Sequence, residues 1–207
     1  MGGGFYERRV FPWLNDVLGG APALQELRRE TLSSAAGRVI EIGFGSGANL
    51  SYYPGTVTAV TGVEPNAGMT DRAVGRAHAT PVPVRIVEGV AEDLPFGDES
   101  FDAAVTTLTL CSVRDPVRVV GELHRVLREG GRLFVLEHGL SPDATVARWQ
   151  ERLNGFQRVV ACGCNLNRSI IALVSAAGFE FEAVRAFSVP GIPRTHGWIT
   201  VGNAVRI

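Results

Sequence analysis

The sequence predicts an α/β protein with a doubly wound, Rossmann-like sheet of seven strands, mostly parallel with an antiparallel C-terminal strand, plus N-terminal helices. Three observations support this class. From residue 38, apolar strand-like runs alternate with helical patterns, which is typical of parallel strands joined by crossover helices. A glycine-rich turn follows the first run, as in other doubly wound sheets. Residues 179–189 and 198–207 are extended runs with no room for a helix between them, so they should pair antiparallel.

Two helices are expected before the sheet. Residues 5–18 place apolar side chains close to a helical stripe, which Pro12 should break or kink. Residues 22–33 should form a second helix with its leucines inward and its arginines, at 28 and 29, outward. Together, residues 1–36 would form a helical cap. The cap either packs on the core or closes over a ligand as a lid, and the sequence leaves both alternatives open.

The rest of the chain divides into strands and helices within one domain. Residues 1–207 show no internal repeat and no linker long enough to separate two domains, so 37–207 should form a single core. Gly178 is the expected stop of the last helix. Strands are expected near residues 38–42, 57–63, 83–88, 101–107 and 131–138, and helices near 47–53, 66–78 and 115–128.

The glycine-rich turn is the strongest functional signal. An apolar strand enters a turn with Gly43, Gly45 and Gly47, and the next apolar strand ends at Glu64, which is expected to be an exposed acid. Glycines let the backbone approach a ligand and adopt positive φ, and a helix after the turn would offer free N–H groups. A carboxylate at the end of the next strand can accept hydrogen bonds from both ribose hydroxyls. The pattern predicts a nucleoside site, unless the turn only connects a strand to a helix.

Two classes of nucleotide cofactor fit this turn. Gly43, Gly45 and Ala48 match the G-x-G-x-x-A pattern of dinucleotide folds, whereas residues 41–47 match the E-x-G-x-G-x-G pattern of S-adenosylmethionine (SAM) sites. A dinucleotide dehydrogenase normally needs a second region to hold its substrate, and 207 residues are about one domain. SAM is therefore favoured, with an NAD-dependent oxidoreductase as the alternative.

Three downstream segments extend the pattern: residues 89–96, 100–105 and 127–135. Together with the glycine turn they resemble, in the same order, motifs of the class I SAM-dependent methyltransferases. In that family an acidic loop after the third strand reaches the adenine, and a turn with two glycines leads into the fifth strand. The resemblance implies a SAM-dependent methyltransferase. A SAM-binding protein without catalytic activity is a third hypothesis.

The resemblance also implies which residues bind SAM. The glycines would pass under its methionine part, Glu41 would orient the ammonium group, and Glu64 would bind the ribose. Glu41 could instead be an acid at the edge of the core. Ala91 and Glu92 lie where the family contacts adenine, although Val90 replaces the usual aspartate before them. The complete set implied for the cofactor is Glu41, Gly43, Gly45, Gly47, Asn49, Glu64, Pro65, Ala91, Glu92, Thr107 and Leu108, the last two beside the sulfonium.

A narrower resemblance covers nearly the whole chain. Residues 109–113, Glu137, His138 and residues 161–168 are similar to small-molecule methyltransferases related to the alkyl-thiol methyltransferases of microsomes. Asn165 departs from that group, whose soluble members carry His and whose membrane members carry Cys at this position. The membrane members also carry an apolar N-terminal anchor, which is not expected here. The resemblance implies a small apolar acceptor, with a thiol first and a quinol, phenol or lipid amine behind it.

His138 is the candidate catalytic residue, because an imidazole near the methyl group could take a proton at neutral pH. It could equally serve only to hydrogen-bond the cofactor loop. Cys111 and Cys164 are better explained as small buried side chains than as nucleophiles. Arg168 would either anchor its loop or bind an acidic acceptor. The three cysteines and four histidines show no metal-ligand spacing, so no metal is expected.

Composition limits the partners. A net charge of −1 and a pI near 6.4 give no basic surface for nucleic acid, so the expected partner is a small molecule. The apolar runs are far shorter than the roughly 18 residues of a membrane helix. No secretory leader is recognised, and the expectation is a cytoplasmic protein without an integral membrane segment, with peripheral membrane contact left open. These data do not predict the oligomeric state.

Overall fold

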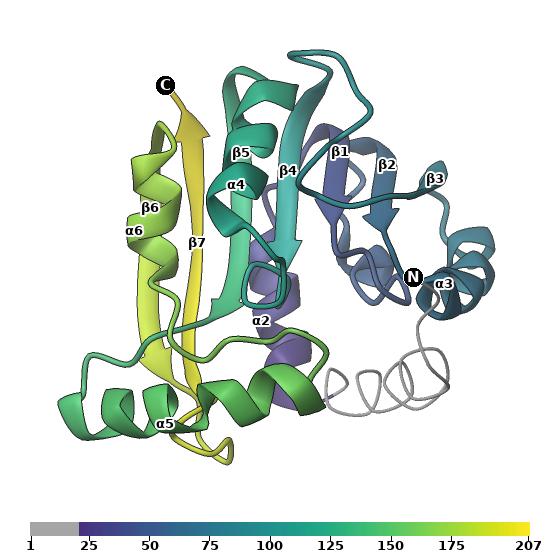
Figure 1. Cartoon of the computed structure of the whole chain (residues 1–207). Coiled ribbons are helices and arrows are strands. Elements are labelled where there is room, and N and C mark those ends of the chain that lie inside the picture. Colours follow the sequence, from purple (N-terminus) through teal and green to yellow (C-terminus); the bar gives the residue numbers. More distant parts are fainter. Residues whose placement is uncertain (1–20) are drawn as a thin grey trace.

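One sheet of seven strands has the spatial order β3-β2-β1-β4-β5-β7-β6 (Figure 1). The computed structural model describes residues 21–207, so the helix predicted over residues 5–18 lies outside the described part. Strands β1 to β5 pair in parallel, and β7 pairs antiparallel with both β5 and β6, which confirms the predicted class. The strands are β1 Gly37–Ile42, β2 Val57–Glu64, β3 Val84–Glu88, β4 Phe101–Thr107, β5 Leu127–His138, β6 Phe179–Ser188 and β7 Trp198–Arg206.

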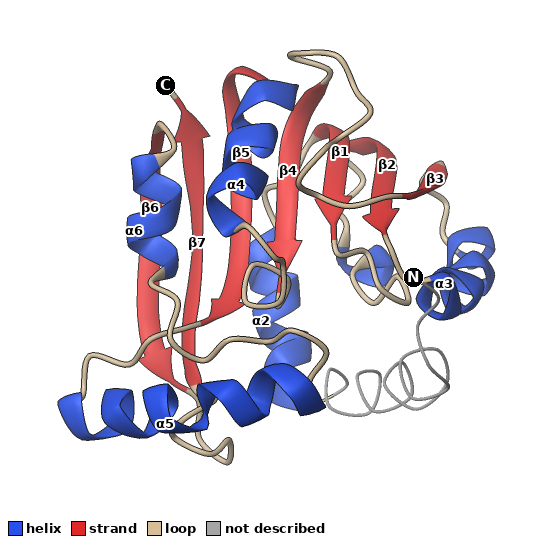
Figure 2. Ribbon diagram, in the orientation of Figure 1, coloured by secondary structure: helices blue, strands red, loops and turns tan. Residues whose placement is uncertain are grey.

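Alternate residues of the central strands are buried on opposite faces of the sheet. In β1, Ile40 and Ile42 belong to one apolar cluster and Val39 to another. Helices α4 and α6 cover the first face, and α2 and α3 cover the second (Figure 2). Burial on both faces explains why these strands are apolar runs without polar alternation. The helices described in residues 21–207 are α2 Pro22–Leu32, α3 Ala67–Ala79, α4 Pro116–Val126, α5 Ala144–Val160 and α6 Ile170–Ala176.

Side-chain caps fix where three of the helices begin. Asn66, Asp115 and Asp143 precede α3, α4 and α5, and each side chain accepts a hydrogen bond from a backbone N–H of the first turn. Gly178, with φ of +89°, follows α6 and ends it as predicted. Within residues 21–207, none of these helices combines the length and the apolar character that crossing a bilayer requires.

Helix α5 lies beside the carboxyl end of β5 (Figure 1). The buried side chain of Gln150 anchors it there: Nε2 donates to the backbone oxygens of Gly139 and Thr195, both at 3.0 Å. Its Oε1 accepts from the N–H of Ser141 at 2.9 Å. The sequence does not predict this helix, because its large apolar side chains are mostly exposed and form no inward stripe.

The prediction of a helix near residues 47–53 was wrong. Residues 45–49 form turns, and only the short 3-10 helix η2 Leu50–Tyr52 follows them. Gly45 and Gly47 have φ of +57° and +76°, which a right-handed helix does not contain. The glycine turn is therefore not followed by the N-terminus of an α-helix, and the N–H groups of Phe44, Gly45 and Gly47 are donated within the protein.

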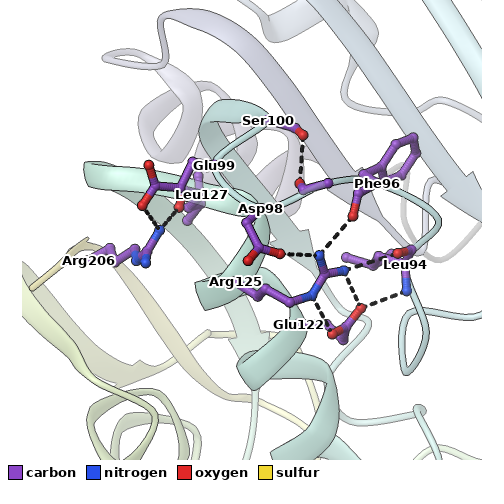
Figure 3. A network of polar contacts seen from close by, with 10 residues as sticks. Leu94, Phe96, Asp98, Glu99, Ser100, Glu122, Arg125, Leu127 and Arg206 are labelled. Carbon is purple, nitrogen blue, oxygen red and sulfur yellow. Dashed lines mark hydrogen bonds and ion pairs between the residues drawn. The ribbon is translucent and has the colours of Figure 1, made fainter.

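A polar network holds the loop before β4 to α4 (Figure 3). Nη1 of Arg125 donates to the backbone oxygen of Phe96 and to Oδ1 of Asp98, both at 2.8 Å. Its Nε and Nη2 donate to the carboxylate of Glu122, which also accepts from the N–H of Leu94 at 2.8 Å. Three of the five hydrogen bonds of the guanidinium reach the loop, at Leu94, Phe96 and Asp98, so the loop that leads from residues 91–92 back to the sheet is fixed from outside the site.

Candidate functional site

A cavity of about 800 Å³ opens at the carboxyl ends of β1, β2, β4 and β5, next to the end of α5. Ligands gather at this edge of open parallel sheets, and the volume falls within the roughly 300–1,000 Å³ of small-molecule sites. Gly47 and Asn49 do not line the cavity. The other residues implied for the cofactor all line it, as does His138: Glu41, Gly43, Gly45, Glu64, Pro65, Ala91, Glu92, Thr107 and Leu108.

The strand order divides the cavity into two ends, with β4 between them. We call the part lined from residues 41–46, 63–66 and 90–92 the cofactor end. The acceptor end is the part lined by Cys111, His138 and residues from 160–164. Thr107 and Leu108, which follow from β4, therefore lie where the two ends meet.

The glycines of the turn are required for different reasons. A Cβ at Gly43 would lie 2.2 Å from Oγ1 of Thr109, so the turn packs directly against the loop after β4. Gly45 has space for a Cβ, whose nearest neighbours would be 3.7 Å away, but its φ of +57° disfavours a side chain. Gly43 therefore maintains packing, and Gly45 maintains a backbone conformation that faces the cavity.

Glu64 connects the end of β2 to the glycine turn. Its Oε2 accepts from the N–H of Gly45 at 2.9 Å, and its Oε1 accepts from the N–H of Asn66 at 2.9 Å. The side chain is only 7% exposed, so the expectation of an exposed acid was wrong. Burial raises the pKa of this carboxyl group, and the two backbone hydrogen bonds oppose that rise. Each carboxylate oxygen has a second lone pair, which leaves capacity for ribose hydroxyls.

Asn49 organises the floor of the cofactor end from outside the cavity. Its buried Nδ2 donates to Oε1 of Glu41 at 2.8 Å and to Oγ1 of Thr107 at 3.0 Å. The hydroxyl of Tyr53 donates to the other oxygen of Glu41 at 2.6 Å. Burial raises the pKa of Glu41 to about 7, against the effect of these hydrogen bonds. Asn49 thus links β1 to the end of β4.

Arg28 of α2 lines the cavity and is 8% exposed, so the expectation that it points outward was wrong. It lies four residues after Leu24 and four before Leu32, which places all three on one helix face, and this spacing could have revealed it. Its Nη1 donates to Oδ1 of Asn49 at 2.6 Å. Its Nε has no hydrogen-bond partner among residues 21–207. Burial lowers its pKa, but a guanidinium remains charged, so α2 places a cation at the wall of the cavity.

The loop implied to reach adenine is held by backbone contacts to the start of α4. Oε1 of Glu92 accepts from the N–H of Arg114 at 2.8 Å and of Asp115 at 3.2 Å. Ala91 is buried at the cavity wall, whereas Val90 is exposed. One oxygen of Glu92 is therefore committed to the protein backbone, and its other oxygen and the loop backbone remain for a ligand.

Glu137 shapes the turn between the two ends. Its fully buried Oε1 accepts from Oγ1 of Thr106 at 2.6 Å and from the N–H groups of Thr109 and Leu110 at 2.8 and 2.9 Å. Within this turn Leu108 has φ of +52°, an unfavourable value for a residue with a side chain. Burial raises the pKa of Glu137, and its Oε2 has no partner among residues 21–207. No structural role for Glu137 was predicted from the sequence.

Three side chains converge at the acceptor end. Nε2 of His138 lies 3.0 Å from Sγ of Cys164, and the ligand atoms of Cys111, His138 and Cys164 all lie within 4.8 Å of one another. A hydrogen bond to Cys111 and burial raise the pKa of the Cys164 thiol. Nδ1 of His138 has no partner among residues 21–207. Spacing could not reveal this cluster, because its members come from three distant segments.

Two side chains join the loops that carry the cysteines. Nη2 of Arg168 donates to the backbone oxygen of Val113 at 2.8 Å, and its Nη1 donates to that of Leu110. Nδ2 of Asn165 donates to the backbone oxygen of Cys111 at 3.0 Å. Of the two alternatives for Arg168, the geometry supports the anchor, because its guanidinium binds the loop after β4.

Comparison with known sequences finds methyltransferases. A family described as Methyltransferase domain matches residues 40–135. Human thiol S-methyltransferase TMT1B is 37% identical over 145 residues, which are 66% of this chain and 58% of that protein. Phosphatidylethanolamine N-methyltransferase from Cereibacter sphaeroides is 33% identical over 138 residues, which are 64% of this chain and 68% of that protein. The chain therefore spans less than two thirds of the length of human TMT1B.

Solved structures with the same fold include a SAM-dependent methyltransferase. A SAM-dependent methyltransferase from Thermotoga maritima, described as a possible histamine N-methyltransferase, superposes with a TM-score of 0.71 at 25% identity over 98% of both chains. The YcgJ protein from Bacillus subtilis superposes with a TM-score of 0.66 at 26% identity over 80% of this chain and 72% of that one. These similarities favour SAM over a dinucleotide as the ligand of the glycine turn.

Proposed function

We propose that this chain transfers the methyl group of SAM to a small apolar acceptor, with a thiol as first choice. The chain belongs to the class I SAM-dependent methyltransferases, which supports this reaction. The observation that carries this proposal is one cavity in which a nucleoside-binding end meets an end lined by thiols and an imidazole. The sequence relatives named as thiol S-methyltransferases support the same acceptor.

In this proposal SAM occupies the cofactor end. Glu64 accepts hydrogen bonds from the ribose hydroxyls, and the turn at Gly43 and Gly45 passes under the methionine part. Glu41 orients the ammonium group, and Ala91 marks the adenine side. The methyl group then points past Leu108 toward the acceptor end. This arrangement is supported by the position of all six residues along the wall of the same cavity.

The acceptor end fits a neutral acceptor better than a cation. Among residues 21–207, those that form it include the apolar Val160 and Ala161 and no Asp or Glu. An amine is protonated at neutral pH, with a reference pKa near 10.4 for an alkyl ammonium, and would find no counter-charge there. A thiol loses its proton more readily than an alkyl ammonium and needs no counter-charge. This difference places the thiol ahead of a lipid amine.

The proposed reaction is an in-line displacement. The acceptor sulfur attacks the methyl carbon, the bond from that carbon to the sulfonium sulfur breaks, and its electron pair stays on S-adenosylhomocysteine. The protein must hold donor and acceptor at about 3–3.5 Å and exclude water. A thiol has a reference pKa near 8.5, and the adjacent sulfonium charge lowers it further. His138, as the proposed catalytic residue, would then assist the loss of the proton without being essential for it.

A panel of acceptors tests the proposal. Release of S-adenosylhomocysteine is measured with thiols, phenols, quinols and amines of matched size, and kcat/KM should be highest for an apolar thiol. A higher kcat/KM for a phenol, quinol or amine would contradict the thiol and leave the enzyme class intact. SAM binding without turnover of any acceptor would indicate a non-catalytic protein. Binding of NAD in place of SAM in a calorimetric titration would contradict the cofactor.

We also propose that the protein acts in the cytoplasm, where the acceptor reaches the cavity from solution or from a membrane surface. The near-neutral net charge and the absence of a spanning helix within residues 21–207 are compatible with this proposal. Cell fractionation of the full chain tests it. Recovery in a membrane pellet after a high-salt wash would contradict it.

A further inference from the structure

Beside His138, the acceptor end contains two cysteines to which the methyltransferase chemistry described above gives no role. Cys111, His138 and Cys164 are all buried, all line the cavity, and place their ligand atoms within 4.8 Å of one another. In a tetrahedral zinc site with Zn–S near 2.3 Å and Zn–N near 2.0 Å, ligand atoms are separated by roughly 3.5–3.8 Å. Shifts of less than about 1 Å would therefore bring these three atoms to the spacing of zinc ligands.

The orientation of the imidazole fits the same role. The 3.0 Å contact between Nε2 of His138 and Sγ of Cys164 places a ring nitrogen beside a second ligand atom of the cluster. An ion bound between the three ligand atoms would replace the hydrogen bond between these two. Two sulfurs and one imidazole nitrogen are also the ligand types that zinc prefers, and magnesium and calcium do not.

The two cysteine loops are fixed to one another, so the cluster does not depend on either loop alone. Asn165, next to Cys164, donates both its backbone N–H and its Nδ2 to the backbone oxygen of Cys111, at 2.8 and 3.0 Å. Arg168 binds the backbone oxygens on both sides of Cys111, at Leu110 and Val113. Asn165 and Arg168 therefore fix the spacing of the two loops that carry Cys111 and Cys164.

We propose that Cys111, His138 and Cys164 bind a zinc ion whose fourth position faces the cavity and binds the sulfur of the acceptor. This inference rests on the proposed function, because it assigns the thiol acceptor a place at that site. Three protein ligands with one open position are typical of catalytic zinc sites, whereas structural sites have four protein ligands. All three side chains line the cavity, so the open position is reachable from it.

The ion would replace a general base. A thiol that binds zinc releases its proton to solvent and stays on the ion as a thiolate. The thiolate sulfur attacks the methyl carbon, and the electron pair of the broken carbon–sulfur bond remains on S-adenosylhomocysteine. The product is a neutral thioether, a weaker ligand than the thiolate, and it leaves. In this reaction His138 holds the ion and does not accept the proton.

Metal binding without any acceptor is the first test. The full chain is stripped with a chelator and titrated with Cd²⁺ and with Co²⁺ while the thiolate-to-metal absorption is recorded. One ion per chain should produce this band, and Cys111→Ser and Cys164→Ser should each lose it or weaken its affinity at least a hundredfold. Cys162→Ser is the matched control, because Cys162 lines the cavity outside the cluster and should keep the band. SAM affinity of each variant verifies that it is folded.

A parent protein without the band, or serine variants at 111 and 164 that keep it while bound SAM shows them folded, would overturn the site. The second test separates the site from the proposed function. Turnover of a thiol by the stripped enzyme should fall at least tenfold and return with one equivalent of Zn²⁺. Full thiol turnover without metal would overturn the inference and leave the proposed function standing. A metal band together with turnover of phenols only would overturn the thiol acceptor, and with it the role of the ion.

Discussion

The two ends of the cavity differ in how the chain builds them. In the cofactor end, the glycine turn and Glu64 lie within about twenty residues of sequence at the ends of two neighbouring strands, and only residues 90–92 come from further along the chain. The acceptor end joins Cys111, His138 and Cys164, which only the strand order and two fixed loops bring together. A cofactor that many proteins share can be recognised by a local motif. An acceptor that differs between relatives is recognised by distant segments, which can change independently.

The two ends also differ in how their buried polar groups are paired. Both oxygens of Glu64 accept backbone hydrogen bonds, so the cofactor end is held in place before a ligand binds. Near the acceptor end, Nδ1 of His138 and Oε2 of Glu137 have no partner among residues 21–207. A buried polar atom without a partner costs about 1–3 kcal/mol, and such atoms are tolerated mainly where function requires them. Nε of Arg28 at the cavity wall is likewise unpaired among residues 21–207, so the contrast applies to the carboxylate of Glu64 and not to every buried group of the cofactor end.

The largest effect on SAM binding is expected from Gly45→Val. A β-branched side chain at φ of +57° strains the turn and extends into the cavity. We expect calorimetry to show a loss of SAM affinity of more than about a hundredfold, which corresponds to about 2.7 kcal/mol. Gly75→Ala is the control, because a Cβ there meets nothing within 4 Å. A folded Gly45→Val protein with normal affinity would mean that the turn only connects β1 to the next segment.

Glu64→Ala should weaken SAM binding by roughly ten- to a hundredfold, or about 1.5–3 kcal/mol, because the ribose loses a charged acceptor. The variant also removes the two hydrogen bonds that hold the turn, so part of the loss comes from a looser turn. The control is Glu88→Ala: Glu88 pairs with Glu64 across β2 and β3 but is exposed and outside the cavity. Equal affinities of the two variants for SAM would remove Glu64 from the cofactor site.

The same contrast explains what the sequence could predict. All seven strands lie within a few residues of their predicted positions, apart from the earlier start of β5 at Leu127. The central strands are apolar runs buried on both faces, which is a strong signal, whereas β6 is largely exposed and was predicted as an extended run after Gly178. The turn and Glu64 were found because they are local. The expected helix after the turn failed because positive φ at Gly45 and Gly47 outweighs the helical pattern of the residues that follow. Helix α5 was missed because its apolar side chains face outward.

The candidate site could be predicted from the sequence only where its residues follow a local motif. Glycine and acid positions along the cofactor end follow from motif spacing, but the bonds that Asn49 makes from behind the cavity wall do not. The spacing of Arg28 to Leu24 and Leu32 indicates that it is buried. The prediction placed it outward because charged residues are usually exposed. The cysteine and histidine cluster depends on loop geometry, which no spacing along the chain encodes.

Glu41→Gln should have a smaller effect on SAM affinity and a clear effect on how stability depends on pH. The folded pKa of Glu41 is about 7, above the ordinary 4.5, so the folded state holds a proton more tightly than the unfolded state. This contribution is complete below pH 4.5 and is lost as pH rises through 7, up to about 3 kcal/mol. Chemical denaturation of the SAM-free protein should show the unfolding free energy of the parent falling over this range. The variant should show a smaller fall, and an identical slope would contradict the assignment.

The smallest effect on SAM affinity is expected from His138→Ala, because His138 belongs to the acceptor end, and calorimetry should give affinities within about twofold of the parent. Turnover of a thiol should still fall at neutral pH, by less than the roughly 10²–10⁴-fold of an essential general base. The pH–rate profile at saturating SAM separates two roles. If His138 only accepts a proton, the loss disappears as pH rises and the thiolate forms without help. If it holds zinc with Cys111 and Cys164, the loss persists at high pH, and this persistence is the expected result. A variant with the parent's rate at every pH would leave positioning of the two sulfurs as the enzyme's main contribution.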